Sequence, residues 1–142
     1  HTLVCVVRNW HVRAWCETTG GYRDFALSRF RGEPDVVRQR ARHTVHQDDE
    51  WNRELTLVLA PDSRLSRDCR DIIATDYGMT DHRLELTTRA ALAPYLLSNL
   101  GVSMDAPHPD PLIQQLELAN PEQVHLGSPR QHKAVKAVAG LC

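Results

Sequence analysis

Apolar and polar residues alternate with a period of two near the start of the chain. Residues 2–7 form a strand-like apolar run, and in residues 10–16 the apolar residues at even positions share one face of an extended strand. A second alternating segment, residues 22–29, follows the pair Gly20-Gly21. Glycine adopts positive φ without strain, so this pair is typical of a tight hairpin turn. The pattern therefore predicts a β-hairpin.

The periodicity changes after residue 50. Residues 54–60 are expected to form a strand that stops at Pro61. Ser66 is the expected N-cap of a helix that ends at Gly78. The apolar residues that recur at helical spacing in this segment are Cys69, Ile72, Ile73 and Tyr77.

A second strand and a second helix are expected next. Residues 83–87 alternate, with both leucines turned inward, and a helix is predicted over about residues 90–100. The apolar stripe of that helix consists of Leu92, Leu96 and Leu100. Because a proline in a helix interior costs up to about 3 kcal/mol, Pro94 predicts a kink or a late helix start.

These elements follow the order strand, helix, strand, helix, with a final mixed segment over residues 112–126. The order predicts a small α+β sandwich in which two helices cover one face of an antiparallel sheet. The other face of the sheet would then be open for a partner.

Composition limits the class of protein. With 142 residues, 42% of them hydrophobic and 25% charged, the chain has the composition of a globular domain. A net charge of −1 argues against coating nucleic acid through bulk charge. Residues 1–31 nevertheless contain five arginines against two acids, so a nucleic-acid contact would be local. No apolar run approaches the roughly 20 residues that cross a membrane, and the four cysteines show no C-x-x-C spacing, which favours a reducing cytoplasm.

Two motifs in the predicted hairpin carry a family resemblance. The first segment reads Trp10-His11-Val12 and the second reads Arg23-Asp24-Phe25-Ala26-Leu27-Ser28-Arg29. They resemble the Trp-Tyr-Leu and Arg-x-Phe-x-Leu-x-Arg motifs of WYL domains, the small Sm-like β-barrels of bacterial transcription regulators. The second motif matches at every fixed position, whereas His11 replaces the tyrosine of the first. The run Trp-His-Val-Arg-Ala is most similar to the WYL repressors associated with phage-defence systems of the BREX and CBASS types.

The resemblance implies four regions in an α+β chain. Residues 1–31 would be the C-terminal strands of a partial Sm-like or SH3-like barrel, and residues 32–52 a linker rich in charge and histidine. Residues 53–127 would be an α+β extension that dimerises, followed by a tail over residues 128–142. Because the chain opens inside a strand-like run, we expect it to be the C-terminal part of a longer regulator whose winged helix-turn-helix holds operator DNA.

The resemblance also implies a ligand and its site. WYL domains sense nucleotide-like or single-stranded nucleic-acid effectors, and the residues expected to bind one here are His11, Arg13, Arg23 and Arg29. Guanidinium groups bind phosphates bidentately, and aromatic neighbours can stack on bases. The expected protein is a homodimeric repressor rather than an enzyme, with no cofactor, no metal and no membrane partner.

Two alternatives remain open from the residues alone. In the first, Arg23 and Arg29 pair with acids such as Asp24 or Glu17, and the chain is an assembly module without a ligand pocket. Under either interpretation, we expect the barrel core to contain Trp10, Phe25 and Leu27. In the second and weaker one, a metal-dependent hydrolase uses His43, His46, Asp48 and Asp49. The linker context favours a solvated surface for those four residues.

Overall fold

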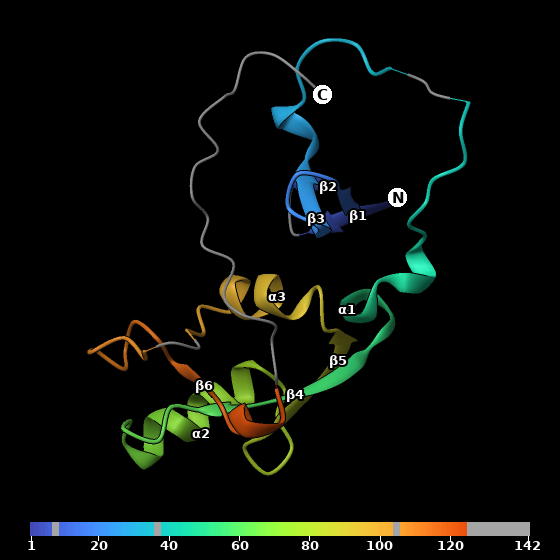
Figure 1. Cartoon of the computed structure of the whole chain (residues 1–142). Helices are drawn as coiled ribbons and strands as arrows, with labels where there is room; N and C mark the ends of the chain where they lie inside the picture. The colour runs from blue at the N-terminus through green and yellow to red at the C-terminus, as the bar shows by residue number, and fades with distance from the viewer. Residues whose placement is uncertain (7–8, 36–37, 104–105, 125–142) are drawn as a thin grey trace.

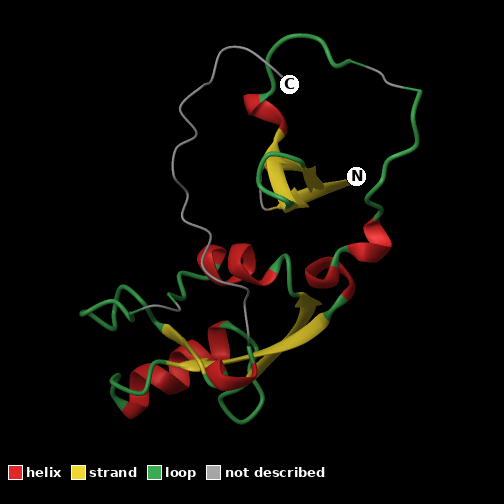
Figure 2. Cartoon of the chain, in the orientation of Figure 1, coloured by secondary structure: helices red, strands yellow, loops and turns green. Residues whose placement is uncertain are grey.

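The computed structural model describes residues 1–6, 9–35, 38–103 and 106–124. These residues form two three-stranded antiparallel sheets and a few short helices, so the predicted α+β class is confirmed. The first sheet lies at the top of the molecule and the second at the bottom, with two helices between them (Figures 1 and 2). No closed barrel is present among the described residues. The predicted tail over residues 128–142 lies outside them.

The first sheet, called sheet A, has the strand order β1-β2-β3. Its strands are β1 (Thr2–Val6), β2 (Asn9–Cys16) and β3 (Gly21–Ala26). Strands β2 and β3 form the predicted hairpin, with Val12 opposite Phe25 and Arg13 opposite Asp24. Gly20 in the turn has a φ of +61°, the conformation for which its glycine was expected.

The two faces of sheet A differ from the prediction. The inner face, which points toward the rest of the molecule, carries His11, Arg13 and Trp15, and Arg13 is buried. The outer face carries Trp10, which is 51% exposed, and the expected core assignment of Trp10 is therefore wrong. Leu27 is also exposed, because strand β3 ends at Ala26 and a 3₁₀ turn, η1 (Leu27–Arg29), takes its place.

The segment expected to be a linker is ordered at its C-terminal end. It contains a 3₁₀ turn, η2 (Val45–Gln47), followed by a short helix, α1 (Asp49–Asn52). The Thr44 and Gln47 side chains form a capping box around η2, and the Asp48 carboxylate caps α1 by accepting from the Trp51 N–H. This local chemistry places Asp48 in a fixed position.

The second sheet, called sheet B, has the strand order β5-β4-β6. Its strands are β4 (Glu54–Pro61), β5 (Leu84–Arg89) and β6 (Leu116–Leu118). Both β4 and β5 were predicted within a few residues of these bounds. A last 3₁₀ turn, η3 (Pro121–Gln123), follows β6.

Two helices cover the face of sheet B that carries Leu57 and Leu59. Helix α2 (Arg67–Asp76) begins after the predicted N-cap, where Ser66 Oγ accepts from the Cys69 N–H. Helix α3 (Ala93–Asn99) has Pro94 in its first turn, which confirms the late start. The core is one apolar cluster formed by Leu57, Leu59, Leu65, Ile73, Ala93, Leu97, Val102, Leu116 and Val124.

Two details of the predicted helices are corrected. Ile72 was expected to face the core but is 61% exposed, while Ile73 beside it is buried. In α3 the deepest leucine is Leu97, which is 1% exposed and lies one position after the predicted stripe. In the part of the chain that the structure describes, none of the helices has the length and hydropathy needed to span a membrane.

Candidate functional site

A buried ion-pair cluster joins sheet A to the rest of the molecule. Arg13 on β2 is only 3% exposed, and its Nε and Nη2 donate to the two carboxylate oxygens of Asp48 at 2.6 and 2.8 Å. This bidentate geometry is the strongest form of an arginine–carboxylate contact. Asp48 lies 35 positions later in the sequence, so the pair closes the whole linker loop.

Two further carboxylates complete the cluster. Arg13 Nη1 donates to Asp24, its cross-strand neighbour on β3, at 3.1 and 3.2 Å. Arg13 Nη2 also donates to Glu50 at 3.0 Å. Asp24 in turn accepts from the Tyr95 hydroxyl of α3 at 3.1 Å. The cluster therefore contacts sheet A, α1 and α3, and we call the residues Arg13, Asp24, Asp48, Glu50 and Tyr95 the junction.

The electrostatics of the junction favour a permanently charged Arg13. Burial by itself lowers the pKa of Arg13, but the hydrogen bonds to Asp48 and the charge of Asp24 outweigh that effect and raise its pKa above the ordinary value. A buried charge needs this complete set of partners, because removal of one leaves the others uncompensated. Arg13 is thus engaged by three carboxylates.

Aromatic contacts surround the junction. The His11 ring lies 5.7 Å from the Tyr95 ring, and Trp15 stacks on His43 at 3.8 Å with an interplanar angle of 15°. The Tyr22 hydroxyl donates to the Thr44 carbonyl, and burial raises the pKa of Tyr22. The inner face of sheet A is thereby attached to the end of the linker and to α3.

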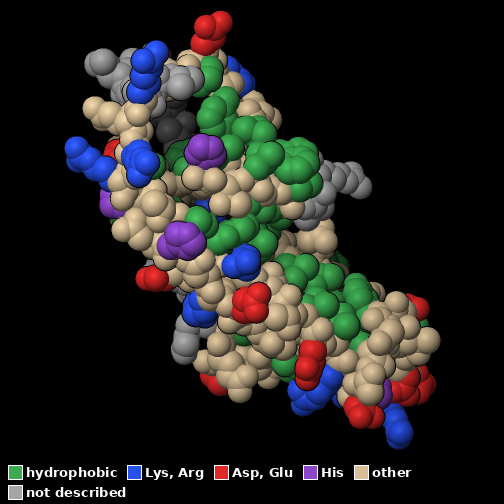
Figure 3. Space-filling model, turned by 90° about the vertical axis from the view of Figure 1, so that its right-hand side faces the viewer, with side chains coloured by type: hydrophobic (Ala, Val, Ile, Leu, Met, Phe, Trp, Pro, Cys, Tyr) green, Lys and Arg blue, Asp and Glu red, His purple; other side chains and the backbone are tan. Residues whose placement is uncertain are grey.

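The outer face of sheet A carries the other arginine of the motif. The register places Arg23 opposite Ala14 and Phe25 opposite Val12, so both lie on the face away from Arg13. Arg23 Nε donates to the Thr19 hydroxyl at 3.2 Å. Large exposed apolar side chains share or flank this face; they are Leu3, Trp10, Leu27 and Phe30. Figure 3 shows hydrophobic side chains in a band that runs from the upper part of the molecule through its centre.

The four residues expected to bind a ligand are thus divided between the inner face of sheet A, its outer face and the turn η1. His11 and Arg13 lie on the inner face, where His11 Nδ1 is buried without a hydrogen-bond partner among the described residues. Arg23 lies on the outer face, and Arg29 is exposed in η1. The structure brings His11 and Arg13 together and separates them from Arg23. A ligand role for each of the four remains a prediction.

Sequence reasoning missed the partners of Arg13. Asp48 was assigned to a solvated linker, yet it is 3% exposed. The capping box at Thr44 and Gln47, directly before the run Asp48-Asp49-Glu50, was a readable sign of local order there. Nothing in the sequence pattern pointed to Tyr95, because it contacts Asp24 across 71 positions.

The alternative metal site does not assemble. His43 stacks on Trp15, and Asp48 is bound to Arg13. Within residues 1–124, leaving out those without a description, no group of three or more His, Cys, Asp or Glu side chains is arranged to hold a metal ion. The linker residues serve the junction instead.

Comparison with known proteins identifies the C-terminal part. Residues 54–124, half of the chain, match the model of the BrxR transcriptional regulator C-terminal dimerization domain. These residues contain sheet B, α2, α3 and the whole apolar core described above.

Curated relatives cover nearly the whole chain. A DNA-binding transcriptional repressor, CapW, from Escherichia coli strain KTE188 is 35% identical over 129 residues, which are 88% of this chain and 41% of that protein. CapW of Stenotrophomonas maltophilia is 34% identical over 115 residues, or 81% of this chain and 38% of the relative. CapW of Pseudomonas aeruginosa is 33% identical over 124 residues, with 87% and 41% covered. The chain spans about two fifths of the length of these relatives.

The match extends over every element of sheet B and its helices, and the relatives carry the similarity into sheet A. The chain therefore belongs to the family of BrxR transcriptional regulators, and residues 54–124 are its C-terminal dimerization domain.

Proposed function

We propose that this chain is the dimerising and effector-sensing region of a bacterial, cytoplasmic, DNA-binding transcriptional repressor. The observation that carries the proposal is the match of residues 54–124 to a dimerization domain, supported by similarity to CapW repressors. With a net charge of −1, the chain lacks the bulk charge for operator binding, which we assign to a winged helix-turn-helix outside these 142 residues. We infer a role in regulating phage defence from the resemblance to WYL repressors.

The dimer contact is proposed on the exposed aliphatic side chains of the dimerization domain. Interface cores are depleted of charge and rich in apolar groups. In residues 54–124 the large exposed aliphatic side chains are Ile72 at 61%, Leu112 at 63% and Ile113 at 68%. The open face of sheet B is more polar, because it carries Thr56, Glu85 and Thr87.

Sedimentation velocity over a concentration series tests dimerisation. The unmodified chain is expected to sediment as a dimer, and Ile72→Glu or the pair Leu112→Glu with Ile113→Glu to shift it toward monomer. Leu3→Glu is a matched control, because Leu3 is 58% exposed but lies on sheet A. A monomer at every concentration of the unmodified chain would refute dimerisation by this region alone.

We further infer that sheet A belongs to a WYL-type barrel and binds the effector, a nucleotide or single-stranded nucleic acid. What supports this is the outer face, where Arg23 lies on the same side as Trp10 and Phe25. Guanidinium and aromatic groups side by side suit a phosphate next to a base. Arg29, exposed just after β3, would extend the cationic edge.

The junction would couple the effector to the dimer. Arg13 and Asp24 lie on the inner face of the strands whose outer face carries Arg23, and they contact α1 and α3. We assign His11 and Arg13 to this coupling, because both lie on the inner face and the Arg13 guanidinium is engaged by three carboxylates. An effector can change the dimer only if it binds two arrangements with unequal affinity.

Fluorescence anisotropy with a short labelled single-stranded oligonucleotide tests effector binding. Arg23→Ala and Arg29→Ala are expected to weaken salt-sensitive binding, whereas Arg40→Ala, an exposed arginine of the linker, is expected to leave it unchanged. Equal loss in all three variants would indicate nonspecific attraction. No binding by the unmodified chain would favour the alternative, a protein–protein assembly module without a ligand pocket.

A further inference from the structure

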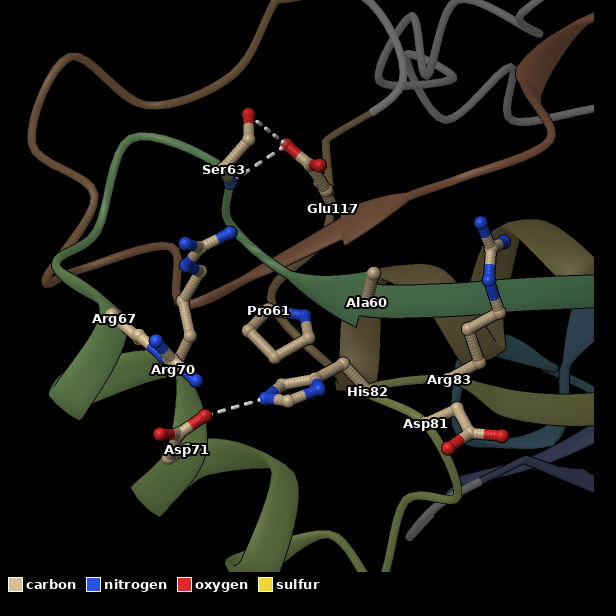
Figure 4. A pocket seen from close by; sticks show the side chains of 10 residues that line it. All are labelled: Ala60, Pro61, Ser63, Arg67, Arg70, Asp71, Asp81, His82, Arg83 and Glu117. Carbon is tan, nitrogen blue, oxygen red and sulfur yellow. Dashed lines mark hydrogen bonds and ion pairs between the residues drawn. The ribbon is translucent and has the colours of Figure 1, made fainter.

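A cavity in the dimerization domain lies apart from sheet A and the junction. It has a volume of about 350 Å³ and is formed where β4 ends, beside α2 and the turn before β5. Its charged lining includes Arg67, Arg70, Arg83, His82 and Asp71 (Figure 4). A cavity of this size suits a small molecule rather than a duplex backbone.

The arginines of this cavity differ from the structural arginines of the protein. Arg13 has three carboxylate partners, and Arg64 donates to both oxygens of Asp62. In contrast, Arg67, Arg70 and Arg83 form no side-chain hydrogen bond or ion pair within the described part of the chain. The guanidinium groups of Arg67 and Arg70, both on α2, are therefore available to one anion, whereas Arg83 lies on the other side of Ala60 (Figure 4).

Arg70 gives the most direct sign of a missing partner. Its Nε is buried and has no hydrogen-bond acceptor among the described residues. Buried polar groups in native proteins almost always have a partner, and an unpartnered one calls for an explanation. Because this Nε is closed to solvent, an anion in the cavity would form a hydrogen bond with it only after the Arg70 side chain moved.

The acids of the lining either have hydrogen-bond partners or are exposed. Asp71 binds His82 Nε2 at 2.7 Å, and Glu117 accepts from the Ser63 N–H and hydroxyl at 3.2 and 3.0 Å. Asp81 is exposed in the turn, beside His82. The three arginines of the lining balance its three acids in formal charge. The net charge of the cavity would therefore not attract a purely anionic ligand. A ligand with an anionic group and hydroxyl groups fits the lining better, because hydroxyls can donate to Asp81 and Glu117.

We propose that this cavity binds a small hydroxylated phosphate ester, with the phosphate held by Arg67 and Arg70 of α2 and the hydroxyl groups by the neighbouring acids. The site is separate from the proposed effector surface on sheet A. It would make the dimerization domain itself responsive to a metabolite. Because a ligand of the folded state stabilises that state, binding would raise the melting temperature of the domain.

Ribose 5-phosphate is the probe, used with the full chain in isothermal titration calorimetry and thermal melts. We expect saturable binding of one molecule per chain and a melting temperature that rises with probe concentration. Ribose should not bind, and inorganic phosphate should bind more weakly than ribose 5-phosphate. Since a charge-assisted hydrogen bond contributes roughly 1.5–3 kcal/mol, Arg67→Gln and Arg70→Gln should each weaken binding by about tenfold or more.

Arg40→Gln is the matched control, because it removes the same charge from an exposed linker position. Melting curves without the probe establish that each variant is folded, and either arginine variant alone is sufficient for the test. Absence of saturable binding to the unmodified chain would overturn the proposal. So would equal weakening by Arg40→Gln and the two cavity variants. Sedimentation in the same buffers reports dimerisation separately, so the two proposals can fail independently.

Discussion

The two sheets of this protein are stabilised in different ways. Sheet B is covered by helices and has a core in which Leu57 and Leu59 are completely buried. In sheet A the only buried apolar side chain among the described residues is Val4, at 8% exposure. Sheet A is instead attached through charged and aromatic contacts at the junction. In its described part, sheet A has no apolar core of its own. Its stability should therefore fall when the polar side chains of the junction are substituted.

The largest expected effect comes from Arg13→Met. Removing one member of a buried ion-pair cluster typically costs about 3–5 kcal/mol, because the remaining carboxylates stay buried without a counter-charge. Hydrogen exchange should accelerate in β1–β3 and change little in β4 and β5. Arg23→Met, on the opposite face of the same sheet, is the control. Uniform acceleration over both sheets would mean that they unfold as one unit.

Leu57→Ala should accelerate hydrogen exchange in sheet B rather than in sheet A. Truncation of a fully buried leucine leaves a cavity and costs about 3 kcal/mol. Urea unfolding should show this loss in the free energy of unfolding, with exchange accelerated throughout sheet B. Leu3→Ala, at a position that is 58% exposed, should cost far less. Similar losses for the two leucines would contradict the contrast between the sheets.

Tyr95→Phe tests the contact between α3 and sheet A by removing a single hydrogen bond. The substitution removes the hydroxyl that donates to Asp24 at 3.1 Å and preserves the ring against His11. Loss of one such hydrogen bond typically costs about 1 kcal/mol. The expected change in urea unfolding is small, and it should largely disappear in an Arg13→Met background, where the junction is already broken. Full additivity of the two substitutions would show that the contacts are independent.

The smallest expected effect is a pH dependence within the dimerization domain. The hydrogen bonds from Arg64 hold the pKa of Asp62 below its ordinary value of 3.8. A carboxyl with a lowered folded-state pKa stabilises the protein above that ordinary value, and the contribution is lost as pH falls below it. Melting temperatures between pH 5 and pH 3 should fall more steeply for the unmodified chain than for Asp62→Asn. Parallel curves would count against this assignment.

The hairpin and the elements of sheet B could be predicted because their signals are local. Alternation, the glycine of the turn, the Ser66 cap and the position of Pro94 each act within a few residues. The alternation correctly placed the even-numbered residues of 10–16 on one face of the hairpin, but it did not show which face is buried. Trp10 looked like a core residue by its type, whereas the fold covers the face that carries Arg13.

For the candidate site too, the sequence showed the local motif but not the contacts between distant residues. The sequence singled out His11, Arg13, Arg23 and Arg29 through a motif. It could not show that Arg13 is bound by carboxylates while Arg23 lies on the opposite face of the sheet. The carboxylates around Arg13 come from β3, the linker and α1, and the Tyr95 hydroxyl comes from α3. The cavity arginines, Arg67, Arg70 and Arg83, form no motif, because they line one cavity only when the turn before β5 folds beside α2.

By itself, the sequence determined the α+β class, the order of the elements and the family resemblance, since periodicity and capping depend on neighbours along the chain. Only the tertiary structure decided which arginines are structural and which are available. Arg13 and Arg64 donate to carboxylates, whereas Arg70 Nε has no acceptor among the described residues. That distinction depends on distances between residues far apart in the sequence, and these distances exist only once the chain has folded.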